Sequence, residues 1–181
     1  MTTDPDKAQE WLEDWTDVTG VEGLVVKALN QRYRPGVRDR AWTKIRRRDT
    51  TEAIIGAITD TLARPQLLIL GRHDPTGRLR PIGRTVPLRP DAARQLAEHL
   101  TPASSGHPWT GAKFSSARGT RDVLDTTLVQ PGVVAEISAD TAVDHGGVWR
   151  QPVRFKRLRL DVTVEDVPPF GAPPGPSATV G

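Results

Sequence analysis

"QLLILGRHDPTGRLRPIGRTV", residues 66–86, contains two strand-like runs separated by a turn. The first run, "QLLILGRH", is aliphatic, and the "DPTG" at 74–77 has the side chains that favour a reversal of the chain. The second run, "RLRPIGRTV", begins directly after the glycine. This stretch therefore predicts an antiparallel hairpin.

The residues on either side of the hairpin predict another strand, a helix and a loop. "TEAIIGAIT" (51–59) precedes the hairpin and is strand-like. "RPDAARQLAEHL" (89–100) follows it as a helix, because Ala92, Leu96 and Leu100 share one stripe and Pro102 lies beyond the end. Residues 101–120 are expected to form a long polar loop.

Two later segments alternate as strands do. In "GVVAEISADTAV" (132–143) one expected face comprises Val133, Ala135, Ile137 and Ala139, and the other Glu136, Ser138 and Asp140. In "VRFKRLRLDVTV" (153–164) Leu158, Leu160, Val162 and Val164 are expected to share a face, with Arg157, Arg159 and Asp161 on the opposite one. About five strands and one helix fit an oligonucleotide/oligosaccharide-binding (OB) barrel within a mainly β, α+β chain. Composition alone leaves other small barrels open.

The first 48 residues have a different pattern. A helix is expected near the start because Ala8, Trp11, Leu12 and Trp15 recur at helical spacing. "GLVVKAL" (23–29) follows as a short strand, and "AWTKIR" (41–46) as another. Alternation in the latter places Trp42, Lys44 and Arg46 on one face.

Positive charge is concentrated between residues 32 and 48, where eight basic residues stand against Asp39 alone. Of the 25 basic residues in the chain, five are lysines and the rest arginines. Arginine binds phosphate through two parallel hydrogen bonds, so this bias favours an anionic partner. A solvated arginine-rich loop and a bias from GC-rich coding are equally acceptable explanations.

Other classes of site and location are disfavoured by composition. The chain has no cysteine, and its four histidines show no metal-ligand spacing, so no zinc site is expected. No apolar run approaches the ~20 residues that span a bilayer, and the N-terminus does not resemble a signal peptide. We therefore expect a cytoplasmic protein without a membrane partner.

The order of three motifs resembles ATP-dependent DNA ligases of the actinobacterial, ligase D-like type. They are "EGLVVK" (22–27), "YRPGVRDRAWTKIR" (33–46) and "RQPVRFKRLRLD" (150–161), and the resemblance covers roughly residues 8–167. It implies a C-terminal fragment of a nucleotidyltransferase domain at 1–48 and an OB-fold domain at 49–167. Residues 168–181, rich in Pro and Gly, are expected to form a disordered tail.

The resemblance also implies roles for individual residues. Glu22 matches a carboxylate that holds Mg²⁺, Lys27 lies at the ATP pocket, and Lys44 and Arg46 match a basic pair at the α-phosphate. Arg159 and Asp161 match the closing motif, which orients pyrophosphate. The remaining basic residues assigned to DNA contact are Arg34, Arg38, Arg40, Arg47, Arg48, Arg154 and Arg157.

One motif of such ligases is absent from this sequence. The lysine that accepts AMP lies in a Lys-x-Asp-Gly motif, which this chain does not contain. We therefore expect a ligase-like protein of DNA repair and recombination that does not adenylate itself, and whose missing part is supplied by a separate chain or lost by truncation. The alternatives are a non-catalytic OB-fold DNA-binding module, a relative of RNA ligases or capping enzymes, and a basic domain without a nucleic-acid role.

Overall fold

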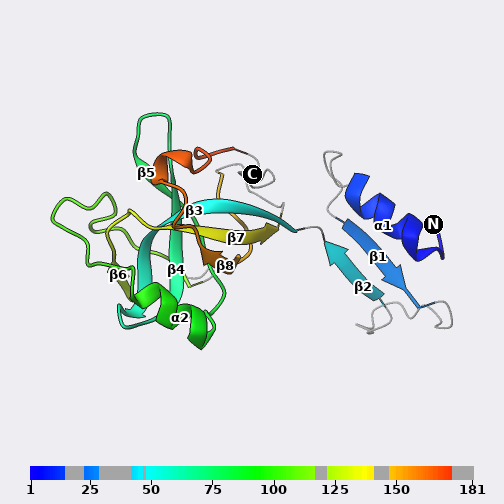
Figure 1. Ribbon diagram of the computed structural model, residues 1–181, viewed down its shortest axis with the longest axis horizontal. Helices are drawn as coiled ribbons and strands as arrows, with labels where there is room; N and C mark the ends of the chain where they lie inside the picture. The colour runs from blue at the N-terminus through cyan, green and yellow to red at the C-terminus, as the bar shows by residue number, and fades with distance from the viewer. Residues whose placement is uncertain (15–22, 29–41, 47, 117–121, 141–146, 173–181) are drawn as a thin grey trace. The chain divides into compact units, whose positions relative to one another are not determined.

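A computed structural model describes residues 1–14, 23–28, 42–46, 48–116, 122–140 and 147–172 (Figure 1). The chain divides into two compact units, Met1–Arg48 and Asp49–Gly181. Each unit has its own sheet, and each is described by itself.

The first unit consists of one helix and a two-stranded antiparallel sheet. Its elements are α1 (Pro5–Asp14), β1 (Gly23–Lys27) and β2 (Trp42–Arg46). The backbone N–H of Asp6 donates to Asp4 Oδ1 at 2.9 Å, which satisfies one unpaired donor at the start of α1 beside Pro5. The predicted helix and both strands are confirmed, and the helix lies against β1 (Figure 1). Trp15 lies outside the described residues.

The second unit is built from antiparallel strands with one α-helix between them. The elements are β3 (Arg48–Thr61), β4 (Arg64–His73), β5 (Leu79–Arg84), α2 (Pro90–Ala97), β6 (Thr126–Leu128), β7 (Val134–Asp140), β8 (Arg154–Leu158) and the 3-10 turn η2 (Val164–Asp166). The predicted hairpin is β4–β5. Its turn is fixed by Asp74 Oδ1, which accepts hydrogen bonds from Thr76 N and Arg78 N, while Gly77 takes a φ of 77°.

These strands close into a barrel. The sheet has the order β5-β4-β3-β7-β8, with β6 paired to β3, and a parallel bridge between Thr85 and Val153 joins its two ends. Val86 N donates to Val153 O at 2.8 Å, and Val153 N donates to Arg84 O at 2.9 Å. A five-stranded closed sheet with its helix between the third and fourth main strands is an OB fold, as predicted.

The barrel unit has two hydrophobic cores, one on each face of its central strands. The inner core lies inside the barrel and is covered by α2; its largest fully buried members include Ile55, Ile58, Leu68, Leu70, Ile82, Leu96 and Ile137. The outer core comprises Ile54, Ala57, Ile69, Leu79, Trp109, Val134 and Val167. Residues 51–58 of β3 are therefore buried on both faces.

The described part of the expected polar loop, residues 101–116, contains no helix or strand, but its Trp109 belongs to the outer core. Trp109 in this segment is only 4% exposed, and its indole N–H donates to Leu79 O at 2.9 Å. The indole lies over Gly56 of β3 and Gly71 of β4, where a Cβ atom would stand 2.3 and 2.8 Å from its ring atoms. Two glycines in consecutive strands thus admit one large aromatic side chain.

The structure also corrects two predictions of which side chains lie on the same face, one in a helix and one in a strand. In α2 the buried pair is Ala93 and Leu96, whereas Ala92 is only partly buried. The last strand ends at Leu158 instead of continuing to Val164, because the chain turns at 160–161. As a result Leu160 is 66% exposed although Leu158 is buried, and Arg159 is 5% exposed although Arg157 is exposed, so neither expected pair shares a face.

The first residues of the predicted tail belong to the barrel unit. Phe170 N donates to His73 O at 2.8 Å, and the Arg72 guanidinium donates to Ala172 O at 3.4 Å. Residues 173–181 lie outside the described residues.

Candidate functional site

The β1–β2 sheet brings three of the predicted nucleotide-binding positions onto one face. The register pairs Gly23 with Arg46, Val25 with Lys44 and Lys27 with Trp42. Paired residues in an antiparallel sheet share a face, and alternate residues along a strand share it as well. Backbone positions 27, 44 and 46 therefore belong to the same face, and Glu22 lies outside the described residues.

The described side chains on this face combine a cation with apolar surface. Lys27 Nζ stands 4.0 Å from the centroid of the Trp42 ring, a cation–π contact. Trp42 is 48% exposed and Val25 is 51% exposed. A flat aromatic group beside positive charge can receive a ligand that has both a planar ring and an anionic group.

The basic segment is described only in part. Arg34, Arg38, Arg40 and Arg47 lie outside the described residues, and Arg48 is described only through its backbone at the start of β3. Their role in DNA contact stays a prediction.

Arg159 and Asp161 of the predicted closing motif are in direct contact. Arg159 Nε donates to Asp161 Oδ1 at 2.9 Å, and Nη2 donates to Asp161 Oδ2 at 2.9 Å. These hydrogen bonds lower the pKa of Asp161 and raise the pKa of Arg159. The Asp161 side chain is 59% exposed, so its carboxylate lies at the surface while the guanidinium beneath it is buried.

Two glutamates that the sequence reasoning missed complete the environment of Arg159. Nη1 of Arg159 donates to Glu52 Oε1 at 2.7 Å and lies 3.7 Å from Glu136 Oε2. Glu52 comes from β3 and Glu136 from β7, and both are nearly buried. The signal that could have found Glu52 is a charged residue in the otherwise apolar "TEAIIGAIT", since buried charges in cores are paired.

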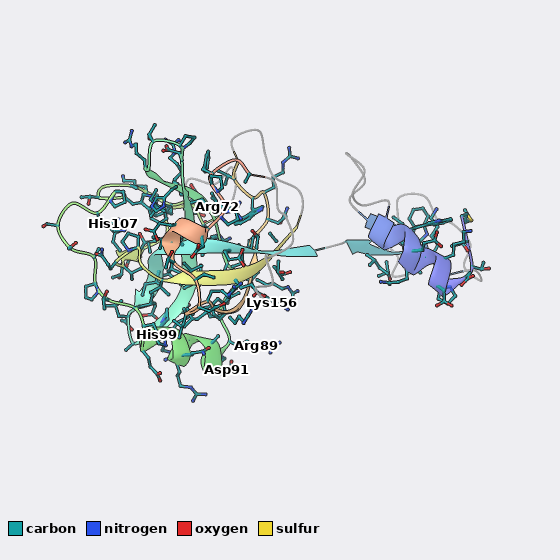
Figure 2. All side chains as sticks on the ribbon, turned by 45° about the horizontal axis from the view of Figure 1, so that its top comes forward. Arg72, Arg89, Asp91, His99, His107 and Lys156 are labelled. Atoms are coloured by element: carbon teal, nitrogen blue, oxygen red, sulfur yellow. The ribbon has the colours of Figure 1, made fainter. Side chains whose placement is uncertain are left out.

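Arg72 forms a second buried contact with the same part of β3. Its Nη2 donates to Thr51 Oγ1 at 2.6 Å, and Nε donates to Glu52 O at 3.2 Å. Burial lowers the pKa of Arg72 to about 10, and the charge of Glu52 opposes that shift. Arg72 also lies over the Trp149 ring, 5.4 Å from its centroid, and Figure 2 shows Arg72 within the barrel unit. Its role is therefore structural.

The two arginines of the barrel that were predicted to contact DNA are both exposed on β8. Arg154 is exposed, and Arg157 is exposed although its Nε donates to Glu136 Oε2 at 2.9 Å. Lys156, between them, is exposed as well and was not predicted.

No group of three or more carboxylates or histidines in the described part of the chain is arranged to hold a metal ion. Glu52, Glu136 and Asp161 converge on the Arg159 guanidinium instead, and Glu136 also pairs with Arg157, so each of the three carboxylates has a cationic partner. Among the residues that the structure describes, no helix has the length and apolar character needed to cross a membrane.

The architecture defines a class: an OB-fold barrel preceded by a small unit with a cationic, partly apolar sheet face. No protein-family model matches the sequence. Curated relatives do match. The chain is 31% identical over 176 residues to a probable DNA ligase of Anaeromyxobacter dehalogenans strain 2CP-1, covering 92% of this chain and 31% of the relative. It is 31% identical over 172 residues to a probable DNA ligase of Nocardia farcinica, covering 88% of this chain and 29% of the relative.

Solved structures give the same result. The ligase domain of Mycobacterium tuberculosis LigD matches with a TM-score of 0.53 and 28% identity, covering 81% of this chain and 47% of that one. A mycobacterial DNA ligase D in complex with ATP and MES matches with a TM-score of 0.52 and 27% identity, covering 82% and 46%. The chain is therefore similar in sequence and fold to ATP-dependent DNA ligases of the ligase D type, and the resemblance read from its motifs is confirmed. It spans about a third of the length of the curated relatives.

Proposed function

We propose that the chain acts as the part of an ATP-dependent DNA ligase that holds nucleotide phosphates and DNA during nick sealing in repair and recombination. The observation that supports this most directly is the register of β1 and β2, which gathers the motif positions of Lys27, Lys44 and Arg46 on one face. Phosphoryl transfer depends on positioning and on neutralisation of charge, and such a face can supply both.

The two units have different proposed roles. Lys44 and Arg46 neutralise the α-phosphate of ATP, and Lys27 with Trp42 lines the nucleotide pocket. Glu22 is proposed to be the carboxylate ligand of Mg²⁺, and only the family resemblance supports this role. The barrel binds the DNA backbone, and Arg159 with Asp161 forms the closing motif. A cytoplasmic location is proposed on the same family grounds.

The nucleophile is the part that must come from elsewhere. A lysine amine attacks ATP to form a phosphoramidate with AMP, and this sequence contains no Lys-x-Asp-Gly motif. We therefore propose that the chain does not adenylate itself. It would complete a site with polypeptide that carries the lysine, either on a separate chain or in a longer form of the protein.

The test is adenylation with and without such a lysine. The purified chain is incubated with radiolabelled ATP and magnesium, and a covalent AMP adduct is sought on a denaturing gel. We expect no adduct from the chain alone. We expect sealing of a nicked duplex when the lysine-carrying portion of the Nocardia relative is added, and loss of that sealing with Lys44→Ala. An adduct on the chain alone would contradict the proposed incompleteness.

A second candidate is a DNA-binding module without chemistry. It is favoured by the contacts of Arg159, whose Nε, Nη1 and Nη2 already donate to Asp161 and Glu52, so a triphosphate would compete with these carboxylates in this conformation. Salt-dependent DNA binding that ATP does not alter, together with no sealing after addition of the lysine-carrying portion, would support this candidate over the first.

A further inference from the structure

The surface that OB folds commonly use for nucleic acid is covered in this barrel. In such folds the face of the second and third strands receives the ligand, which corresponds here to β4 and β5. That outer face carries Trp109, whose ring lies against Gly71 of β4 and Leu79 of β5. Phe114 packs edge-to-face on Trp109 with 5.3 Å between ring centroids.

This cover is part of the folded core. Trp109 is held by a hydrogen bond from its indole N–H to Leu79 O, and Val167 from the C-terminal segment packs into the same cluster. Displacing it would expose a buried tryptophan and the apolar strands beneath. A nucleic acid that used this face would first have to unfold the outer core, so the barrel needs a different docking surface.

The β8 strand offers such a surface because a bulge changes the direction of its side chains. Ile137 pairs with Phe155 and Glu136 pairs with Arg157, which leaves Lys156 without a partner in the register. Arg154, Lys156 and Arg157 are therefore all exposed, three cations within four residues, where strict alternation would expose fewer. Figure 2 shows Lys156 apart from His107 of the segment that covers the strand face.

The three cations of this β8 ridge differ in how much charge they can offer. Arg157 shares its charge with Glu136 at 2.9 Å. Arg154 and Lys156 have no ion-pair partner among the described residues. Uncompensated, exposed cations are the groups that release counterions when they meet a phosphate backbone, and two on one short strand can reach neighbouring phosphates.

We propose that the β8 ridge, and not the β4–β5 strand face, is where the barrel binds the phosphate backbone of duplex DNA. Arg154 and Lys156 make the phosphate contacts, and Arg157 contributes less because Glu136 already holds it. This inference rests on the proposed function. It adds which surface binds DNA and which of the three cations contribute most to binding.

The experiment measures binding of a fluorescein-labelled nicked duplex by anisotropy, with the full chain, between 50 and 200 mM salt. The variant Arg154→Gln/Lys156→Gln is compared with Arg78→Gln/Arg80→Gln, which removes the same charge from the β4–β5 hairpin beside the covered face. Because each lost phosphate contact lowers the slope of log K against log salt by about 0.9, we expect the ridge variant to lose about two units of slope. The hairpin variant should keep the slope of the unaltered protein.

The outcomes distinguish the location of the DNA-binding surface from DNA binding itself. Loss of slope in the hairpin variant with an unchanged ridge variant would overturn the assignment of the surface while leaving DNA binding intact. Absence of salt-dependent DNA binding by the unaltered protein would instead reject the proposed function of the barrel. Thermal unfolding followed by circular dichroism confirms that both variants are folded, and the single variants Arg154→Gln and Lys156→Gln, each expected to lose about one unit, replace the double variant if it is not.

Discussion

Replacing Gly56 with alanine tests the packing of the outer core directly. The added Cβ would lie 2.3 Å from Trp109 Cζ3 and 2.6 Å from Cη2, whereas carbon atoms in contact prefer about 3.5 to 4.0 Å. The indole would have to retreat by about 1.2 Å or more. Its N–H bond to Leu79 O and its contact with Phe114 oppose that movement.

The expected cost follows from these distances. Overpacking a close-packed core costs about 1 to 3 kcal/mol, and a clash with a ring held on two sides belongs at the upper end. Alanine also restricts the unfolded chain relative to glycine, which returns about 0.4 to 1 kcal/mol. We therefore expect Gly56→Ala to lower the free energy of unfolding by about 2 kcal/mol, measured by urea denaturation and far-ultraviolet circular dichroism.

Two further variants test whether the cost of Gly56→Ala comes from its contact with Trp109. Gly132→Ala is the matched control, because nothing lies within 4 Å of a Cβ at that position, and we expect it to be neutral or slightly stabilising. Trp109→Phe removes the outer ring of the indole, so Gly56→Ala should cost less in that background, with a coupling of about 0.5 kcal/mol or more. Equal stability of the two alanine variants, or an equal cost with Phe at 109, would refute the packing argument.

Three further predictions concern charged and aromatic groups. Glu52→Gln should destabilise the barrel by about 2 kcal/mol by leaving Arg159 partly unpaired, and Glu52→Gln/Arg159→Met should recover most of that loss in urea denaturation. Burial lowers the pKa of His107, so the unfolded state binds more protons below about pH 6.5, and stability should fall as pH drops through that value; His107→Gln should flatten this profile. Trp42→Ala should cost about 1 kcal/mol, because Trp42 is half exposed and the substitution removes its cation–π contact with Lys27.

Each of these predictions has an opposing outcome. A double variant no more stable than Glu52→Gln would mean that the guanidinium packs against groups other than the carboxylates. A pH profile that His107→Gln leaves unchanged would assign the titration elsewhere; in the structure His107 Nδ1 accepts from Trp109 N, and Nε2 has no hydrogen-bond partner among the described residues. Unfolding caused by Trp42→Ala would show that the indole is part of a core.

Local features of this fold were readable from the sequence, and features that depend on distant residues were not. The β4–β5 hairpin was predictable because Asp74 and Gly77 determine the turn within four residues. Five of the six described strands of the barrel unit, and the position of its helix, were predictable from the sequence pattern, whereas β6 was not predicted. Trp109 was missed because its segment is polar in composition, and the space for its ring is created by two glycines in other strands.

In the candidate site, too, local features were predictable and features that depend on distant residues were not. Alternation in "AWTKIR" placed positions 44 and 46 on one face, and the register added Lys27. The burial of Arg159 could not be read from "RLRLD", because its partner Glu52 lies 107 positions away in the chain. Likewise the exposure of both Lys156 and Arg157 depends on a bulge, which alternation within a single strand does not reveal.

The closure of the barrel determines where unwanted self-association would begin. A sheet joined end to end through Thr85 and Val153 offers no long unpaired edge to another molecule. The β1–β2 sheet has only two described strands, with Val26 and Ile45 exposed on the face opposite Lys27. Aggregation on storage would therefore start in the first 48 residues, and a charged side chain at Val26 or Ile45 would suppress it without touching the cationic face.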